Sequence, residues 1–488
     1  MFNKPYHFPE DQKVLHELLE KYEKMQHENK SQYFEVDELI ILASYLASSN
    51  RPLEAEAIID YALRLHPGNS DIMIYQAQNL AANNDFEAAL QILDKINEQY
   101  DREVIFTRAS ILLHQHHKEK VNEIFQNLAQ EECYSAEVLL DIADVYMDED
   151  MEPEAYTWLM KAIEKHPENK DVKEDLRDFY VKFDRHQDAI SIMKELLNKD
   201  PYNIDEWNNL TGTYLKIDDI EQAFEAVDFA LAIDKNNQRG RELKAATYIS
   251  AGNIDQGIKI LETLSEENNM GMEATSILLN CYTETRDTER GIAFCNKMLQ
   301  QPDLFETEKA KYHCHRAIFH LMKKDIDACK KDISSAMTAD SNYAESYEVL
   351  GEYFLANGDV QSAENEFKTA YQLATEKDEI LEKEALAFFR SGYLIKAIEY
   401  FEQLEKEYHE TMEANYHFLA LAYFYTKKDP ELTKHAIYQS MYYTPEMFET
   451  IEPMKDSENP AEVAYYELAR YCKEWIDKTG RFELSDFD

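Results

Sequence analysis

The sequence predicts an all-α protein in which a pair of short helices is repeated along the chain. Small residues recur every 34 positions, at Ala155, Ala189, Ala223, Gly257 and Gly291. Tyrosines keep the same interval, at Tyr146, Tyr180, Tyr214, Tyr248 and Tyr282. Glycine and proline number only 11 and 12 among 488 residues, which favours helices over loops and flexible linkers.

An interval of this length is typical of stacked helical hairpins. One hairpin buries only one of its faces, whereas neighbouring hairpins cover each other and form a continuous core. A small residue is needed wherever two helices approach closely, and a tyrosine can fill a groove while its hydroxyl group reaches a polar partner. Residues 136–169 show this plan most clearly, as two helical segments joined by a turn.

Residues 136–169 resemble the repeat unit of the tetratricopeptide repeat (TPR) family. The matching residues are Leu139, Ile142, Ala143, Tyr146, Ala155, Leu159, Ala162 and Pro167. The stretch 204–237 adds the tryptophan of the family signature, at Trp207. The resemblance extends over most of the chain. It implies a right-handed α-solenoid, a superhelix of about twelve helix–turn–helix TPR units with helical caps.

The units fit the chain one after another, and their expected bounds are 36–69, 70–101, 102–135, 136–169, 170–203, 204–237, 238–271, 272–309, 310–343, 344–377, 378–412 and 413–445. We therefore expect an N-terminal helical cap at 1–35 and a TPR array at 36–445. Residues 446–488 are expected to form a C-terminal linker and a capping helix with an acidic tail. Pro430 is expected to start the second helix of the last unit.

The charge of the chain restricts its partners. The formal net charge is −45, which disfavours phosphate backbones and anionic lipid surfaces, so neither nucleic acid nor membrane is an expected partner. None of the six cysteines forms a CxxC pair, which indicates a reducing compartment. The sequence shows no apolar leader and no apolar run long enough to span a membrane, so we expect a cytoplasmic protein.

Acidic residues occupy the positions that would face a ligand. In TPR proteins the first helix of each unit lines the concave surface, and its second, fifth and ninth positions point to the ligand. Acids at these positions are Glu137, Asp144, Asp171, Glu174, Asp178, Glu345, Glu348, Glu352, Glu379 and Glu382. The family's peptide-carboxylate clamp needs Lys, Asn and Arg there, so binding of acidic tails is not supported. The acids predict a groove for a basic or polar segment, unless they are only the solvated faces of an acidic protein.

A basic stretch at 309–331 interrupts the acidic chain. Its candidate anion-binding or partner-binding residues are Lys309, Lys311, Arg316, Lys323 and Lys324. They could hold an acidic tail, an anion or an acidic block of a second copy, or they could simply neutralise neighbouring repeats. His313, Cys314 and His315 are adjacent on a helix and fan out by about 100° each, so they cannot all ligate one metal ion, and we expect no metal site.

No catalytic motif occurs in the sequence: HExxH, GxSxG, a Walker A loop and a GxGxxG after a strand are all missing. The sequence therefore predicts a non-catalytic protein–protein interaction scaffold or adaptor without a cofactor. Two alternatives remain, a self-assembling structural repeat protein and, against the charge, a helical-repeat RNA regulator. The oligomeric state and the identity of the partner stay open.

Overall fold

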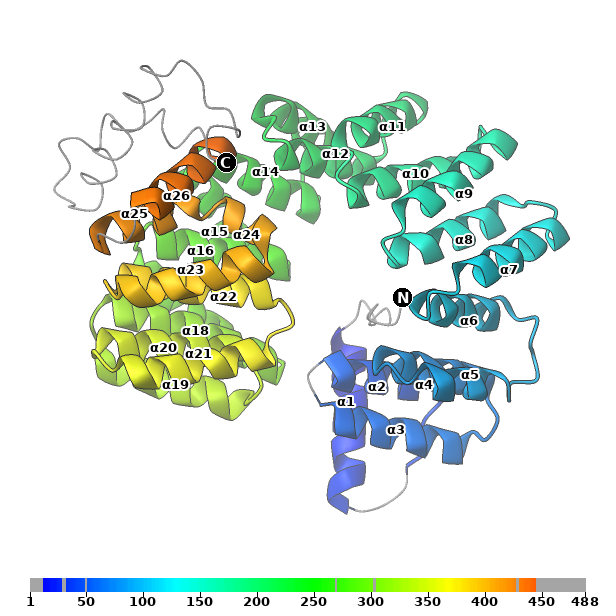
Figure 1. The fold of residues 1–488 in the computed structure, drawn as a ribbon, viewed down its shortest axis with the longest axis horizontal. Helices are drawn as coiled ribbons and strands as arrows, with labels where there is room; N and C mark the ends of the chain where they lie inside the picture. Colours follow the sequence, from blue (N-terminus) through cyan, green and yellow to red (C-terminus); the bar gives the residue numbers. More distant parts are fainter. Residues whose placement is uncertain are drawn as a thin grey trace. The chain divides into compact units, whose positions relative to one another are not determined.

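The computed structural model describes residues 12–28, 32–48, 51–267, 270–301, 304–426 and 430–444. These residues form 26 α-helices and no strand (Figure 1). The chain divides into two compact units, unit 1 (Met1–Cys281) and unit 2 (Tyr282–Asp488), and each is described by itself. The all-α solenoid predicted from the sequence is confirmed.

Unit 1 holds the helices α1 (Gln12–Glu28), α2 (Val36–Ser48), α3 (Pro52–Leu65), α4 (Ser70–Ala82), α5 (Phe86–Leu93), α6 (Arg102–His114), α7 (Lys118–Glu131), α8 (Ala136–Asp148), α9 (Glu152–Lys165), α10 (Lys170–Lys182), α11 (His186–Lys199), α12 (Ile204–Lys216), α13 (Ile220–Ile233), α14 (Gln238–Ser250) and α15 (Ile254–Glu266). The boundary between the units falls within α16 (Met272–Glu284). From α2 onward the helices pack as consecutive hairpins, α2 with α3, α4 with α5 and so on.

Unit 2 continues with α17 (Thr288–Met298), α18 (Glu306–Met322), α19 (Ile326–Ala339), α20 (Ala344–Ala356), α21 (Val360–Leu373), α22 (Lys377–Arg390), α23 (Leu394–Glu407), α24 (His409–Glu413), α25 (Tyr416–Thr426) and α26 (Pro430–Tyr443). Here too the pairs α18 with α19, α20 with α21, α22 with α23 and α25 with α26 pack as hairpins.

Local signals explain where the helices start and turn. Asparagine side chains cap the first helices α4, α10, α12 and α14, and each accepts a hydrogen bond from a backbone N–H of the first turn. The turn inside a hairpin needs a residue with positive φ, and such residues recur every 34 positions at Asp150, Asp184, Asp218, Gly252 and Arg286. Aspartate and glycine tolerate this backbone better than most residues, which is why they dominate these turns.

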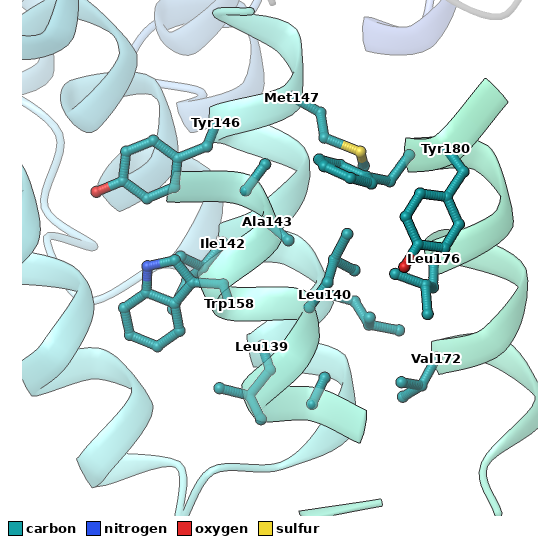
Figure 2. Close-up of a cluster of buried hydrophobic side chains, with 14 of the residues drawn as sticks. Leu139, Leu140, Ile142, Ala143, Tyr146, Met147, Trp158, Val172, Leu176 and Tyr180 are labelled. Carbon is teal, nitrogen blue, oxygen red and sulfur yellow. The ribbon is translucent and has the colours of Figure 1, made fainter. Parts of the chain in front are cut away.

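Each helix of the core packs on its own hairpin and on the next one. Figure 2 shows Leu140 and Met147 of α8 pointing toward Leu176 and Tyr180 of α10. Tyr146 lies on the other side of α8, where its hydroxyl group donates a hydrogen bond of 2.7 Å to Asn122 Oδ1 of α7. The side chain thus fills the groove and satisfies its polar end, as the repeated tyrosines predicted.

The repeated small residues mark the closest helix contacts. Ala155, Ala189 and Ala223 are fully buried. A Cβ atom placed on Gly257 would lie under 3.0 Å from Ile249, and one placed on Gly291 would lie under 3.0 Å from three ring carbons of Phe319. The interval therefore records a steric constraint, because a larger side chain at these positions would push the helices apart.

Several boundaries differ from the prediction. The ninth hairpin begins at Glu306 rather than at residue 310. The unit expected at 272–309 is longer than the 34-residue interval, and its last residues belong to an extended first helix of the next hairpin, α18. The short helix α24 was not predicted. Pro430 does start α26, as expected. At the N-terminus, α1 packs on α2 through Leu15, Leu18 and other apolar residues, whereas the predicted C-terminal segment 446–488 lies outside the described residues.

Two further findings concern the described part of the chain. None of its helices has a long enough apolar stretch to cross a membrane. The five cysteines within it are free thiols, and all except Cys133 are buried.

The close contact at Gly291 gives a stability prediction. Gly291→Ala should lower the free energy of unfolding by about 1–3 kcal/mol, because the added methyl group overpacks against the buried ring of Phe319. Gly212→Ala is the matched control, since Gly212 lies within α12 with open space where the methyl group would go, and it should raise stability by up to about 1 kcal/mol. Urea unfolding of the full chain measures both. Equal effects of the two substitutions would contradict the close-contact interpretation.

Candidate partner-binding surfaces

The first helices of successive hairpins lie next to one another. In unit 1, α2 packs on α4, α4 on α6, α6 on α8, α8 on α10, and α12 on α14. In unit 2, α18 packs on α20 and α20 on α22. We call the surface formed by these helices the first-helix surface of each unit. It carries the second, fifth and ninth positions of the repeats, where the sequence places its acids.

A polar hollow of about 570 Å³ lies on the first-helix surface of unit 1, between α10 and α12. It is lined by Lys170, Glu174, Arg177, Asp200, Tyr202, Asn203, Ile204, Asp205, Glu206, Asn209 and Asn237. Four of these residues are acids, two are cations and three are amides. The lining can therefore accept hydrogen bonds from a cationic group and pair with the main chain of a bound segment.

Arg177 organises this hollow by joining α10 to α12. Its Nε and Nη2 atoms donate to the two carboxylate oxygens of Asp178 at 2.9 and 3.0 Å, and its Nη1 atom donates to Glu206 Oε2 at 2.5 Å. Glu206 is only 1% exposed, and its Oε1 atom has no hydrogen-bond partner in the described structure. Burial raises the pKa of Glu206, and the charge of Arg177 opposes that rise. The pair thus holds a buried acid with one free acceptor beside the hollow.

Neighbouring acids on α10 contribute to a raised pKa of one residue, Asp175. Asp171 and Asp178 are exposed, and Glu174 pairs with Lys170 at 2.8 Å. Burial, with the charges of Asp178 and Asp171, raises the pKa of Asp175 to about 6. Asp175 escaped the sequence analysis because it is at the sixth position of its repeat, next to the positions expected to face a ligand.

On the preceding first helix of unit 1, α8, an arginine partly neutralises the predicted acids. Arg102 Nη1 lies 2.9 Å from Glu137 Oε1 and 3.4 Å from Asp141 Oδ2. Its Nη2 lies 3.3 Å from Glu132 Oε2. Asp144 is half-buried on the same helix, α8. Since Arg102 comes from the preceding hairpin, the acids at the predicted ligand-facing positions of α8 did not by themselves reveal this neutralisation.

In unit 2 the predicted acids lie on two neighbouring first helices, and burial affects the ionisation of two of them, Glu348 and Glu352. Glu345, Glu348 and Glu352 lie on α20, and Glu379 and Glu382 lie on α22. Burial raises the pKa of Glu348 to about 8 and also raises that of Glu352. Lys383 Nζ lies 3.9 Å from Glu348 Oε2 and 4.0 Å from Glu379 Oε2. Glu382 accepts a hydrogen bond of 2.6 Å from Asn415 Nδ2.

Glu384 is the functional candidate that the sequence analysis missed. It lies on α22, is 2% exposed, and burial and then Glu348 raise its pKa to about 9. It occupies the seventh position of its repeat, where the preceding repeat has Leu350 and a core residue is expected. An acid at a core position was the available signal, hidden among 96 acids.

Comparison with known proteins identifies the repeats. Residues 46–105 match the tetratricopeptide repeat family. The chain is a TPR protein. Residues 106–239 match a family described as ChAPs, Chs5p-Arf1p-binding proteins. These matches support a role as a protein-interaction scaffold in general. No curated protein matches the sequence significantly.

Solved structures with a similar arrangement include a tetratricopeptide repeat protein from Parabacteroides merdae. It is 18% identical, with 52% of this chain and 98% of that one covered and a TM-score of 0.40. A chain of the APC/C hetero-tetramer Cut9–Hcn1 is 13% identical, with 94% and 93% covered and a TM-score of 0.35. Both TM-scores are low, so these likenesses carry no argument about function.

The basic stretch of this TPR protein is tied to carboxylates of unit 2. Lys309 pairs with Glu306 at 2.8 Å, and Lys323 pairs with Glu289. Arg316 donates to Asp332 from Nε and Nη2 at 2.9 and 2.5 Å. Lys324 lies in the turn after α18 with a φ of 60°, and burial lowers the pKa of Lys311. Lys309, Arg316 and Lys323 therefore have carboxylate partners within the unit, as expected for neutralisation of neighbouring repeats.

The adjacent residues His313, Cys314 and His315 have different surroundings. His313 Nδ1 lies 3.1 Å from Asp332 Oδ1, whereas Cys314 Sγ lies 3.3 Å from Ser346 Oγ. Burial lowers the pKa of His315 to about 4. Within the described residues, no group of three or more His, Cys, Asp or Glu side chains is arranged to hold a metal ion.

The Arg177–Glu206 pair gives a second stability prediction. Arg177→Ala should destabilise the protein by about 3–5 kcal/mol, because it leaves the buried Glu206 carboxylate without its partner. The double variant Arg177→Ala/Glu206→Gln should recover part of this loss. Lys199→Ala, which breaks the exposed pair with Glu168, is the control and should cost under about 1 kcal/mol. Urea unfolding checks all three, and similar losses for the two single variants would contradict the assignment.

Glu384 gives a prediction about pH. Its folded pKa is raised from 4.5 to about 9, so its contribution to stability is complete below pH 4.5 and is lost as the pH rises toward 9. Glu384→Gln stays neutral. Relative to wild type, it should therefore gain up to about 1.4 kcal/mol per pH unit across that window.

Glu379→Gln on the same helix is the matched control for this effect, since Glu379 is exposed. Unfolding curves at several pH values measure the difference between each variant and wild type. A constant difference for Glu384→Gln from pH 5 to pH 9 would show that Glu384 ionises normally in the folded protein.

Proposed function

We propose that this TPR protein is a non-catalytic scaffold that binds a basic or polar segment of a protein partner along its first-helix surface. In this proposal residues 36–445 form the array that binds, and residues 1–35 cap its N-terminal end. The polar hollow between α10 and α12 carries the proposal. It combines an excess of carboxylates with three amides, and one of the acids predicted to face a ligand, Glu174, lines it.

Three features of the hollow support a basic segment. Asn209 is exposed, and its amide group offers both a donor and an acceptor to a main chain. Asp205 is exposed beside it and attracts positive charge. Glu206 Oε1 keeps an unused acceptor at the wall. A cationic side chain in the hollow would supply the missing donor without competing with Arg177, which uses the other oxygen.

The comparisons add weight to a protein partner at this place. All residues that line the hollow lie within 106–239, the part of the chain that matches the ChAPs family. The name of that family refers to proteins that bind other proteins. The self-assembly alternative receives less support, because Lys309, Arg316 and Lys323 already have carboxylate partners within unit 2.

A charge reversal tests the proposal. A fluorescein-labelled peptide of alternating arginine and serine should bind the full chain, and the corresponding glutamate peptide should not. Asp205→Lys should weaken binding of the arginine peptide by about tenfold, because it replaces an attraction by a repulsion near the ligand. Fluorescence anisotropy at physiological salt measures the dissociation constants.

Glu221→Lys is the matched control. Glu221 lies in the first turn of α13 as Asp205 lies in the first turn of α12, and both are exposed, so the two variants change the net charge equally. Glu221→Lys should change the dissociation constant by less than about twofold. Preference for the glutamate peptide, or an equal loss in both variants, would overturn the proposal.

A further inference from the structure

Two buried carboxyl groups of unit 2 have oxygen atoms without a partner. Glu348 of α20 and Glu384 of α22 each have an Oε1 atom that is buried and accepts no hydrogen bond in the described structure. The two side chains are close enough for the charge of Glu348 to affect the ionisation of Glu384. A buried acceptor without a donor is destabilising, so a pair of them on adjacent helices needs an explanation.

Among the described residues of unit 2, no cation donates a hydrogen bond to either of these two Oε1 atoms. Lys383 is exposed, and its ammonium group lies 3.9 Å from the other oxygen of Glu348, Oε2. Arg390 acts electrostatically on Glu352 rather than on this pair. Both oxygens come from first helices, so they lie beneath the surface that the proposed function assigns to a partner.

We propose that the surface between α20 and α22 binds a cationic side chain, an arginine or lysine of the partner segment, through the carboxyl groups of Glu348 and Glu384. This inference rests on the proposed function and adds a specific contact in unit 2. Glu348 is the entry point, because 12% of its side chain is exposed, and Glu384 lies deeper, where Tyr400 of α23 also faces it. A guanidinium or ammonium group there donates to the two Oε1 atoms and brings the positive charge that ionised carboxylates need.

Binding at this pair is linked to protons. Burial raises the pKa of Glu348 to about 8 and that of Glu384 to about 9, so both groups are largely protonated at neutral pH in the free protein. A bound cation favours the ionised form of each carboxyl group, so the contact releases protons to the solvent. Affinity should therefore rise with pH between about 7 and 9, by up to tenfold per pH unit for each proton released.

Other charged and titratable groups face the pair from the surrounding helices. They are Glu345 and Glu352 on α20, Glu379 and Lys383 on α22, and Tyr400 on α23. On α18, Lys311 interacts electrostatically with Glu345, and His315 interacts electrostatically with Lys383. All of them remain in place when Glu384 alone is changed, so a comparison of variants isolates its contribution.

The experiment uses the full chain and the alternating arginine–serine peptide. Calorimetric titrations in two buffers of different ionisation enthalpy at pH 7.5 should show release of about one proton or more per bound peptide. Glu384→Gln should reduce this release and flatten the pH dependence of the dissociation constant. At pH 6 the variant and wild type should bind within about twofold of each other, whereas at pH 9 wild type should bind about tenfold more tightly.

Glu376→Gln is the matched control, because it removes an exposed carboxylate directly before α22 that is not one of the groups facing the pair, and it should keep both the proton release and the pH dependence of wild type. Glu348→Gln gives a second variant, and circular dichroism verifies that each variant is folded. Binding without proton release, or identical behaviour of Glu384→Gln and Glu376→Gln, overturns this inference and leaves the scaffold proposal intact. Failure of the peptide to bind at any pH overturns both.

Discussion

The close approach of helices at the repeated small positions is the constraint on which the rest of the structure depends. Ala155, Ala189 and Ala223 are fully buried, and Gly291 lies against the ring of Phe319 with no room for a methyl group. Only at this separation can each hairpin cover the apolar face of its neighbour. The repeated tyrosines and the left-handed turn residues follow from the same spacing, because they fill the groove and reverse the chain at fixed points.

This packing also decides where charge can gather. The second helix of each hairpin and the first helix of the next use most of the apolar positions, so many of the second, fifth and ninth positions of the first helices are left without a packing role, although Leu140 at a fifth position packs toward α10. Polar and acidic residues collect there, on surfaces that run from hairpin to hairpin within each unit. A stack built only for stability would have no need to place Glu206 and Glu384 toward its interior, since buried acids lower stability unless they are paired or protonated.

The sequence was sufficient to predict the fold, because the 34-residue interval of the small residues and tyrosines is a direct result of how the helices pack. Tyr146, Ala155 and Trp207 could be assigned without a structure, and the hairpins begin where the period places them as far as α16. The predicted start of the ninth hairpin was wrong. This hairpin begins at Glu306 because its first helix is longer than in the other repeats, and a regular interval cannot predict where a longer helix begins. It was also incomplete for the site. Arg102 and Arg177 reach acids of other hairpins or neighbouring helices, and a charge count within one segment cannot include contacts that only the stacked hairpins create. Glu384 was missed because its position reads as core.

The two buried acids represent two different solutions to one electrostatic problem. Glu206 is held beside a fixed cation, Arg177, whose charge favours the ionised carboxylate and opposes the effect of burial on its pKa. No hydrogen-bond donor reaches Oε1 of Glu384 in the described structure, and burial beside Glu348 favours the neutral acid. The first arrangement suits constant attraction of a basic segment near neutral pH. The second must exchange its proton for a cation before it contributes, so its contribution depends on pH in a range where exposed carboxylates no longer titrate. One chain would then carry two acidic surfaces built on the same repeat geometry. Binding of a cation would be nearly independent of pH at the first surface and would depend on pH at the second.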